Sequence, residues 1–195
     1  GDHHPITATF GLARLTEIDT VGYAIQDAGI ALKRAKLENK GYCCYYTRNM
    51  GGEVRARVRM MQKLRGALGV GSLFLHYQPQ INLQTRRPVG AEALLRWRTE
   101  DGQLIPPDQF IPLAESSGLI IAIGDCVLRS ACKELVALNS EGITNFRMAV
   151  NISVVQFRHV EFVDMLKRII LETGVDPTMV DLEITESVAM QDPER

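Results

Sequence analysis

The second part of the chain alternates between short apolar runs of strand type and longer amphipathic runs of helix type, and this order restricts the fold more than any other feature. The runs are predicted as strand 74–81, strand 88–97, helix 107–116, helix 124–139, strand 147–151, helix 161–173 and strand 179–185. The polar loop at residues 82–87 is typical of a hairpin between the first two strands. Strands that alternate with helices pair in parallel, so the predicted class is α/β with parallel β/α architecture.

Three short segments place oxygen ligands near the carboxyl ends of these apolar runs. They are Glu92–Trp97 (EALLRW), Asn151–Ser153 (NIS) and Glu183–Ser187 (EITES). A barrel built of β/α units gathers its active site at this end of its strands. Two carboxylates and one amide suit Mg²⁺ or Mn²⁺ better than zinc, which prefers nitrogen and sulfur. The segments together therefore predict a metal site for phosphate chemistry.

Alternation along the strands assigns these side chains to faces. Glu92, Leu94 and Arg96 share one face, so a carboxylate and a guanidinium line one wall. The same alternation predicts that three polar side chains of the last strand face the barrel axis: Asp181, Glu183 and Thr185. Buried acids in such positions are unfavourable unless they are paired or bind a metal.

An ordinary structural role remains an alternative for each of these residues alone. Glu92 could simply neutralise Arg96, which lies on the same face of the strand. Asn151 could be a turn former or a helix cap, which are the usual roles of asparagine at a strand end.

The first 70 residues follow a different pattern. Residues 6–12 and 42–46 are predicted strands, and residues 18–37 form a helix pattern with a basic end. We predict a domain boundary near Thr47, with Gly51-Gly52 as a break. A basic amphipathic helix at residues 53–68 follows, and either it binds a membrane surface or nucleic acid, or it packs on the next domain with its arginines in water. The second role is the more common one for such a helix.

Composition gives mostly negative information. A formal net charge of −1 and a pI near 6.5 do not favour a protein that binds duplex nucleic acid. The four cysteines have no C-x-x-C spacing and are predicted to be reduced, packed thiols of a cytoplasmic protein. The longest apolar stretch, at residues 119–127, contains Asp125 and is far shorter than the roughly 20 residues that a membrane helix needs. We therefore expect neither a transmembrane helix nor a signal peptide.

Five ordered motifs are specific as a set. They are Tyr77–Gln80 (YQPQ), Glu92–Trp97 (EALLRW), Phe110–Glu115 (FIPLAE), Asn151–Ser153 followed by Gln156-Phe157, and Glu183–Ser187 (EITES). Together they resemble the motifs of EAL domains, which hydrolyse the bacterial second messenger cyclic di-GMP. The resemblance runs from about Glu53 to the last residue and covers about the first half of such a domain. It implies a partial TIM-like (β/α) barrel of EAL type.

The opening segment resembles the end of a GGDEF domain, the fold of cyclic di-GMP synthases. The similar stretches are Ile6–Leu12, Ala31–Lys36 and Asn39–Gly41. The signature loop of that family would precede Gly1, so no cyclase activity is assigned to this chain. The resemblance implies a tandem GGDEF-EAL protein. Its expected parts are the α+β GGDEF-type end at residues 1–48, a connecting amphipathic helix at residues 49–70, and the N-terminal part of the EAL domain at residues 71–195.

The EAL resemblance also implies roles for individual residues. Three positions match the metal ligands of the family, which uses Mg²⁺ or Mn²⁺ and has two ions in the complete domain: Glu92, Asn151 and Glu183. Three positions match residues that contact the dinucleotide: Gln78, Leu94 and Arg96. Glu186 matches a residue that steadies a neighbouring loop, and no catalytic residue beyond the metal ligands is implied.

The implied activity is metal-dependent hydrolysis of cyclic di-GMP to linear pGpG by the complete parent protein. Active members also use an Asp-Asp pair, a lysine and a further glutamate that would follow Arg195, so we expect the 195-residue chain alone to be inactive or nearly so. The main alternative is a catalytically inactive receptor for cyclic di-GMP. A third hypothesis is that the domain is a structural or dimerising module. The resemblance further implies a homodimer through the EAL domain and a sensory domain, with any membrane attachment, in a preceding region.

Overall fold

The structure is a computed structural model that describes residues 7–15, 21–38 and 41–184. The chain divides into two compact units, residues 1–60 and residues 61–195. The first unit contains β1 (Phe10–Leu12), α1 (Val21–Glu38) and β2 (Cys43–Tyr45). β1 and β2 pair in parallel, and α1 packs against both. The predicted strand, helix, strand order of this segment is confirmed.

Helix α2 (Arg48–Ala67) runs through Gly51-Gly52, so the predicted break at these glycines is wrong. Glycine lowers helix stability by about 1 kcal/mol relative to alanine, but it does not prevent helix formation inside a long helix. Gly51 is buried, and the Tyr46 hydroxyl lies where a side chain at this position would stand. Near the other end of the helix, Leu64 is fully buried and belongs to the core of the second unit.

The second unit is built on a mixed sheet in which the strand order is β3-β4-β6-β7, with β5 paired to β4. The strands are β3 (Leu73–Ile81), β4 (Pro88–Arg98), β5 (Leu104–Ile105), β6 (Arg147–Asn151) and β7 (Val180–Glu183). β3 and β4 form the predicted antiparallel hairpin, while β4, β6 and β7 are parallel. The described part of the sheet is open, and its α/β class agrees with the prediction.

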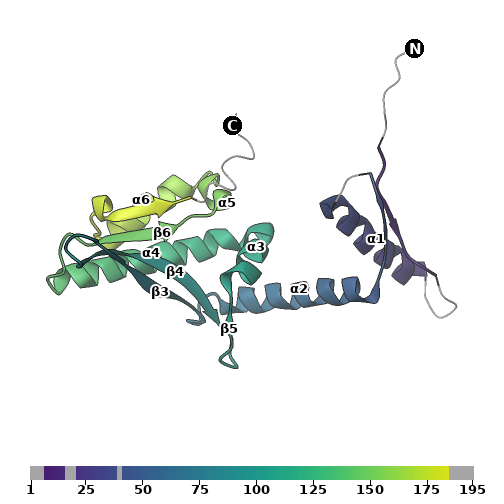
Figure 1. Ribbon diagram of the computed structural model, residues 1–195, viewed down its shortest axis with the longest axis horizontal. Coiled ribbons are helices and arrows are strands. Elements are labelled where there is room, and N and C mark those ends of the chain that lie inside the picture. Colours follow the sequence, from purple (N-terminus) through teal and green to yellow (C-terminus); the bar gives the residue numbers. More distant parts are fainter. Residues whose placement is uncertain (1–6, 16–20, 39–40, 185–195) are drawn as a thin grey trace, which may run out of the picture. The chain divides into compact units, whose positions relative to one another are not determined.

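Helices cover one face of this sheet. They are α3 (Pro107–Ser117), α4 (Leu119–Ser140), α5 (Val154–Phe157) and α6 (Phe162–Thr173). Figure 1 shows α4 lying along the strands, and α3 and α6 both pack against α4. α4 begins at Leu119, earlier than predicted, because its buried positions already recur at helical spacing from Ile120 and Ile123.

The core lies between the sheet and these helices. Trp97 of β4 meets Phe110 of α3 edge to face, with ring centroids 5.5 Å apart. The rest of the core is largely aliphatic. Its fully buried members include Ile123, Leu128, Leu135, Met148, Val150 and Ile169. Alternate residues of β4, such as Ala91, Ala93 and Trp97, point into this core, so the intervening residues point to the opposite face.

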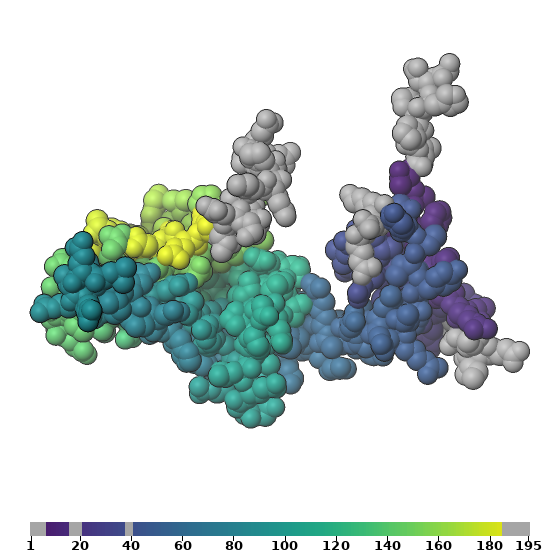
Figure 2. All heavy atoms as spheres, in the orientation of Figure 1, coloured from purple at the N-terminus to yellow at the C-terminus, as the bar shows by residue number. Residues whose placement is uncertain are grey.

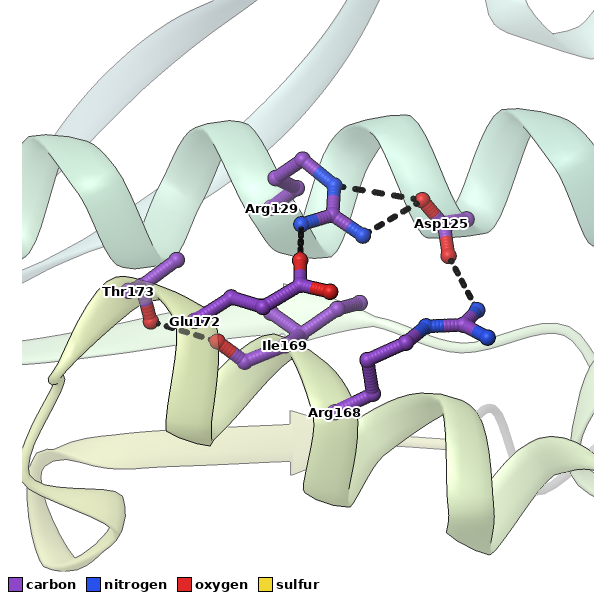
Figure 3. Close-up of polar contacts among 6 residues, drawn as sticks. All are labelled: Asp125, Arg129, Arg168, Ile169, Glu172 and Thr173. Atoms are coloured by element: carbon purple, nitrogen blue, oxygen red, sulfur yellow. Dashed lines mark hydrogen bonds and ion pairs between the residues drawn. The ribbon is translucent and has the colours of Figure 1, made fainter.

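An ionic network joins α4 to α6 across their outer surface (Figure 3). The Asp125 carboxylate accepts from Arg129 on its own helix at 3.3 Å and from Arg168 on α6 at 3.3 Å. Arg129 in turn pairs with Glu172 of α6. The network adds polar links to the buried apolar contacts between the two helices.

Replacing Asp125 with asparagine is expected to lower the free energy of unfolding by about 1 kcal/mol, because two ion pairs of a network are lost together. The difference should shrink in 1 M NaCl, where the Debye length falls to about 3 Å. Urea unfolding at low and high salt measures both effects. Asp164→Asn is the matched control, since Asp164 is exposed and makes only a 3.9 Å contact with Lys167. A salt-independent difference would contradict an electrostatic origin.

The expectation of packed thiols holds only in part. Cys132 is buried, but Cys43 and Cys126 are exposed, and all four cysteines are unpaired. Within the described residues, no single helix has both the length and the apolar composition of a membrane span. In that part of the chain, α3 and α4 pass the test only when they are taken together, and they are bent by 120° relative to each other.

Candidate functional site

The sheet face opposite the helices carries the side chains that the sequence singled out. In the strand register Gln78 lies opposite Glu92, and Glu92 is level with Ala149 of β6 and Asp181 of β7. Leu94 and Arg96 follow Glu92 on the same face because side chains alternate along β4. Parts of β3 (dark teal) and β7 (yellow) are visible on the molecular surface in Figure 2.

Glu92 and Asn151 are in direct contact although they are far apart in the sequence. The Asn151 Nδ2 amide donates to Glu92 Oε1 at 2.6 Å. Asn151 is also the register neighbour of Glu183 on the adjacent parallel strand. The three predicted metal ligands thus lie on neighbouring parallel strands, with Glu92 inside β4, Asn151 at the carboxyl end of β6 and Glu183 at the carboxyl end of β7.

Arg96 is not neutralised by Glu92. Its Nη1 atom donates to the backbone carbonyl of Leu95 at 2.9 Å, and no ion pair to Arg96 occurs within the described residues. Glu92 is instead hydrogen-bonded to Asn151, so among the described residues this carboxylate does not neutralise Arg96. A guanidinium without a carboxylate partner suits an anionic ligand, because its planar fork matches phosphate oxygens.

The donor set fits a hard divalent cation. Nδ2 of Asn151 is engaged with Glu92, so the side-chain atom of Asn151 that remains as a candidate ligand is its amide oxygen. Glu92 and Glu183 offer carboxylate oxygens from the two neighbouring strands. Oxygen donors of this kind are the ligands that Mg²⁺ and Mn²⁺ prefer. Among the described residues, no three His, Cys, Asp or Glu side chains form a metal-binding group. Within the described residues, a site of three protein ligands on these strands therefore includes the asparagine oxygen.

Asp181 lies on the same sheet face, opposite the helices, but its carboxylate already pairs with Arg147. Arg147 of β6 donates to it through Nε at 2.7 Å and through a second guanidinium nitrogen. This hydrogen bonding by the Arg147 guanidinium holds the pKa of the Asp181 carboxyl below its usual value. The pairing satisfies this inward acid without a metal, so the candidate ligand from β7 is Glu183.

A cavity of about 250 Å³ lies beside the carboxyl ends of β4 and β6. Arg96 and Asn151 line it together with Glu115 of α3 and Gln156 of α5, and the rest of its wall is largely apolar. Two of these residues, Glu115 and Gln156, occur in the recognised sequence motifs but received no role from the sequence.

Ser153 connects those residues. Its hydroxyl donates to Glu115 Oε1 at 2.6 Å and accepts from the Val155 amide, while the Ser153 amide donates to Gln156 Oε1. Ser153 and Gln156 form a capping box at the start of α5. The Ser-x-x-Gln spacing is a recognisable signal for this arrangement and was overlooked at the level of sequence.

Tyr77 of β3 faces the helix side of the sheet. Burial of its ring is the main cause that raises the pKa of the phenol to about 12, and the negative charge of Glu134 on α4 adds to it. The folded state therefore holds the neutral phenol at a pH where an unfolded chain would release its proton.

A raised pKa in the folded state contributes stability below pH 10 that is lost as the pH rises toward 12. We expect the free energy of unfolding of the wild-type chain to fall more steeply over this range than that of Tyr77→Phe. The difference in absorbance at 295 nm between wild type and Tyr77→Phe, followed as a function of pH, gives the pKa of Tyr77 directly. Glu134→Gln should lower that pKa, and titration of Tyr77 near pH 10 would contradict the assignment.

Comparison with known families identifies the second unit. The family profile described as EAL domain matches residues 61–195. The chain belongs to the EAL domain family. The described EAL residues have the mixed α/β fold of solved EAL structures, which are TIM-barrel-like, with a sheet that is not closed.

Relatives of this EAL chain include proteins named for cyclic di-GMP turnover. The chain is 37% identical over 166 residues to the bifunctional diguanylate cyclase/cyclic di-GMP phosphodiesterase MucR of Pseudomonas aeruginosa, covering 85% of this chain and 24% of that protein. It is 33% identical over 166 residues to the cyclic di-GMP phosphodiesterase NbdA of the same organism, covering 85% and 21%. The chain thus spans about a quarter of the length of these curated relatives.

A solved structure supports the same relationship. The PaMucR phosphodiesterase in complex with c-di-GMP matches with a TM-score of 0.66 and 41% identity, covering 69% of this chain and 55% of that chain. Glu186, for which the EAL resemblance implied a role in steadying a neighbouring loop, lies outside the described residues, as does Thr185.

Proposed function

We propose that the complete parent of this EAL chain hydrolyses cyclic di-GMP to the linear dinucleotide pGpG. The observation that carries the proposal is the placement of Glu92, Asn151 and Glu183 on neighbouring parallel strands, with Glu92 and Asn151 in hydrogen-bond contact. The names of relatives that act on cyclic di-GMP support the choice of substrate.

In this proposal Glu92, Asn151 and Glu183 hold Mg²⁺ or Mn²⁺ through oxygen atoms. When bound, a pair of such ions supplies positive charge at the phosphodiester and lowers the pKa of an attacking water. Asn151 keeps the Glu92 carboxylate oriented through its amide hydrogen bond. Arg96 binds a phosphate oxygen with its guanidinium, and Gln78 and Leu94 contact the rest of the dinucleotide on the same sheet face.

The remaining parts of the proposal concern the parent protein. The strand, helix, strand arrangement of residues 7–45 supports a GGDEF-type end at residues 1–48, joined by the 49–70 segment to the EAL part at residues 71–195. Four unpaired cysteines favour a reducing compartment, so we place the EAL part in the cytoplasm. A homodimer and an upstream sensory domain complete the expected assembly.

Turnover of cyclic di-GMP by the complete parent, with Mg²⁺ or Mn²⁺, tests the function. Metal-dependent release of pGpG supports it, and the 195-residue chain run alongside is expected to be inactive or nearly so. Tight binding of cyclic di-GMP without turnover would replace the enzyme with a receptor. Neither binding nor turnover would reject both functions.

A further inference from the structure

The backbone that follows Asn151 is held on both sides. The Ile152 amide donates to the Glu183 carbonyl at 2.8 Å, which continues the pairing of β6 with β7 by one residue. Ser153 then caps α5 with an extended backbone, φ −69° and ψ 143°. The direction of the chain at Ser153 therefore governs how the Asn151 side chain is presented at the strand end.

Ser153 makes more hydrogen bonds than its cap requires. The capping box needs only the bonds between Ser153, Val155 and Gln156, which measure 3.1 Å each. The additional bond runs from the Ser153 hydroxyl to the Glu115 carboxylate on α3 and is the shortest of the set at 2.6 Å. Hydrogen bonds to an ionised carboxylate are about twice as strong as neutral ones. Glu115 thus ties the segment after Asn151 to a different helix.

Gln156, the second member of the capping box, packs closely against α4. Gln156 is only 3% exposed, and a methyl group added at Gly124 of α4 would overlap its amide nitrogen. Position 124 therefore leaves room for Gln156 because it has no side chain. α3 and α4, which pack against each other, hold the Ser153 segment through Glu115 and Gln156.

We propose that Glu115 is a positioning residue for metal binding, which acts through Ser153 to hold Asn151 in the orientation that presents its amide oxygen to the ion. The proposal rests on the metal site of the proposed function. Glu115 lines the same cavity as Asn151 but comes from α3, outside the strands that supply the ligands. Partners that orient a metal ligand typically contribute about 10- to 100-fold to metal affinity.

Binding of Mn²⁺ alone to the complete parent, followed by electron paramagnetic resonance, tests this role without any substrate. The relevant binding component is the one that Asn151→Ala removes. Glu115→Ala and Ser153→Ala are each expected to weaken that component by about tenfold or more. Glu115→Gln and Ser153→Thr keep the acceptor and the hydroxyl, respectively, and should bind within about threefold of wild type. Glu141→Ala, at the exposed end of α4, is the control for a lost glutamate.

Melting temperatures of all variants separate positioning from unfolding. Loss of a capping interaction is worth about 1 kcal/mol, so the truncated variants are expected to remain folded. Unchanged Mn²⁺ affinity in Glu115→Ala would overturn the inference even if the parent hydrolyses cyclic di-GMP. The expected Mn²⁺ pattern without turnover would support the inference and reject the proposed enzyme. A parent that binds no Mn²⁺ at this site would overturn the inference.

Discussion

Replacing Glu92 with glutamine in the complete parent is expected to reduce cyclic di-GMP turnover by about a thousandfold. Glutamine keeps an oxygen that can accept from Asn151 Nδ2, so the 2.6 Å contact and the fold should survive. The carboxylate charge is lost, and a bound metal contributes several kcal/mol to the transition state, where each 1.4 kcal/mol is a factor of ten. Steady-state kinetics with Mg²⁺ titration measures the loss, which should appear in kcat at every accessible metal concentration.

Glu141→Gln is the matched control for that experiment. Glu141 is exposed at the end of α4, away from the candidate ligands, so the same loss of charge should leave turnover within about twofold of wild type. If Glu92→Gln retained full activity, Glu92 would not be a metal ligand. Full activity would leave the hydrogen bond with Asn151 as a structural contact only.

The largest expected effect on stability is that of Phe110→Ala. Phe110 is fully buried between α3 and the sheet and meets Trp97 edge to face. Truncating a buried phenylalanine removes its apolar surface and leaves a cavity, which lowers stability by about 3–5 kcal/mol. Trp97 is the only tryptophan of the chain, so its fluorescence during urea unfolding reports directly on the packing around Phe110.

Leu83→Ala provides the comparison, because Leu83 lies in the hairpin loop and is 91% exposed. Its free energy of unfolding should stay within about 0.5 kcal/mol of wild type. A similarly small change for Phe110→Ala would show that the contact between Trp97 and Phe110 is not part of a packed core. A change in the slope of the urea curve would point instead to an altered unfolded state.

The elements that the sequence located well are those with a strong period. The hairpin, the parallel strands and the α6 helix follow from alternation at two residues or at 3.6 residues, and each appears within a few residues of its predicted position. The errors fall where local propensity and packing disagree. The glycine pair Gly51-Gly52 predicts a break, yet α2 continues through it because the residues on both sides are helical. β5 and α5 are too short for a period to reveal.

By itself, the sequence determined the periodicities that set the α/β class and placed Glu92, Asn151 and Glu183 in apolar strand runs. It could not determine which side chains meet, because contacts between distant residues depend on strand register and helix packing. Tertiary structure alone decided that Glu92 bonds to Asn151 and that Arg147 neutralises Asp181. It also decided that Glu115 of α3 holds Ser153. In each case the two residues are 34 to 59 positions apart in the chain, and they are joined only when the strands pair and the helices pack.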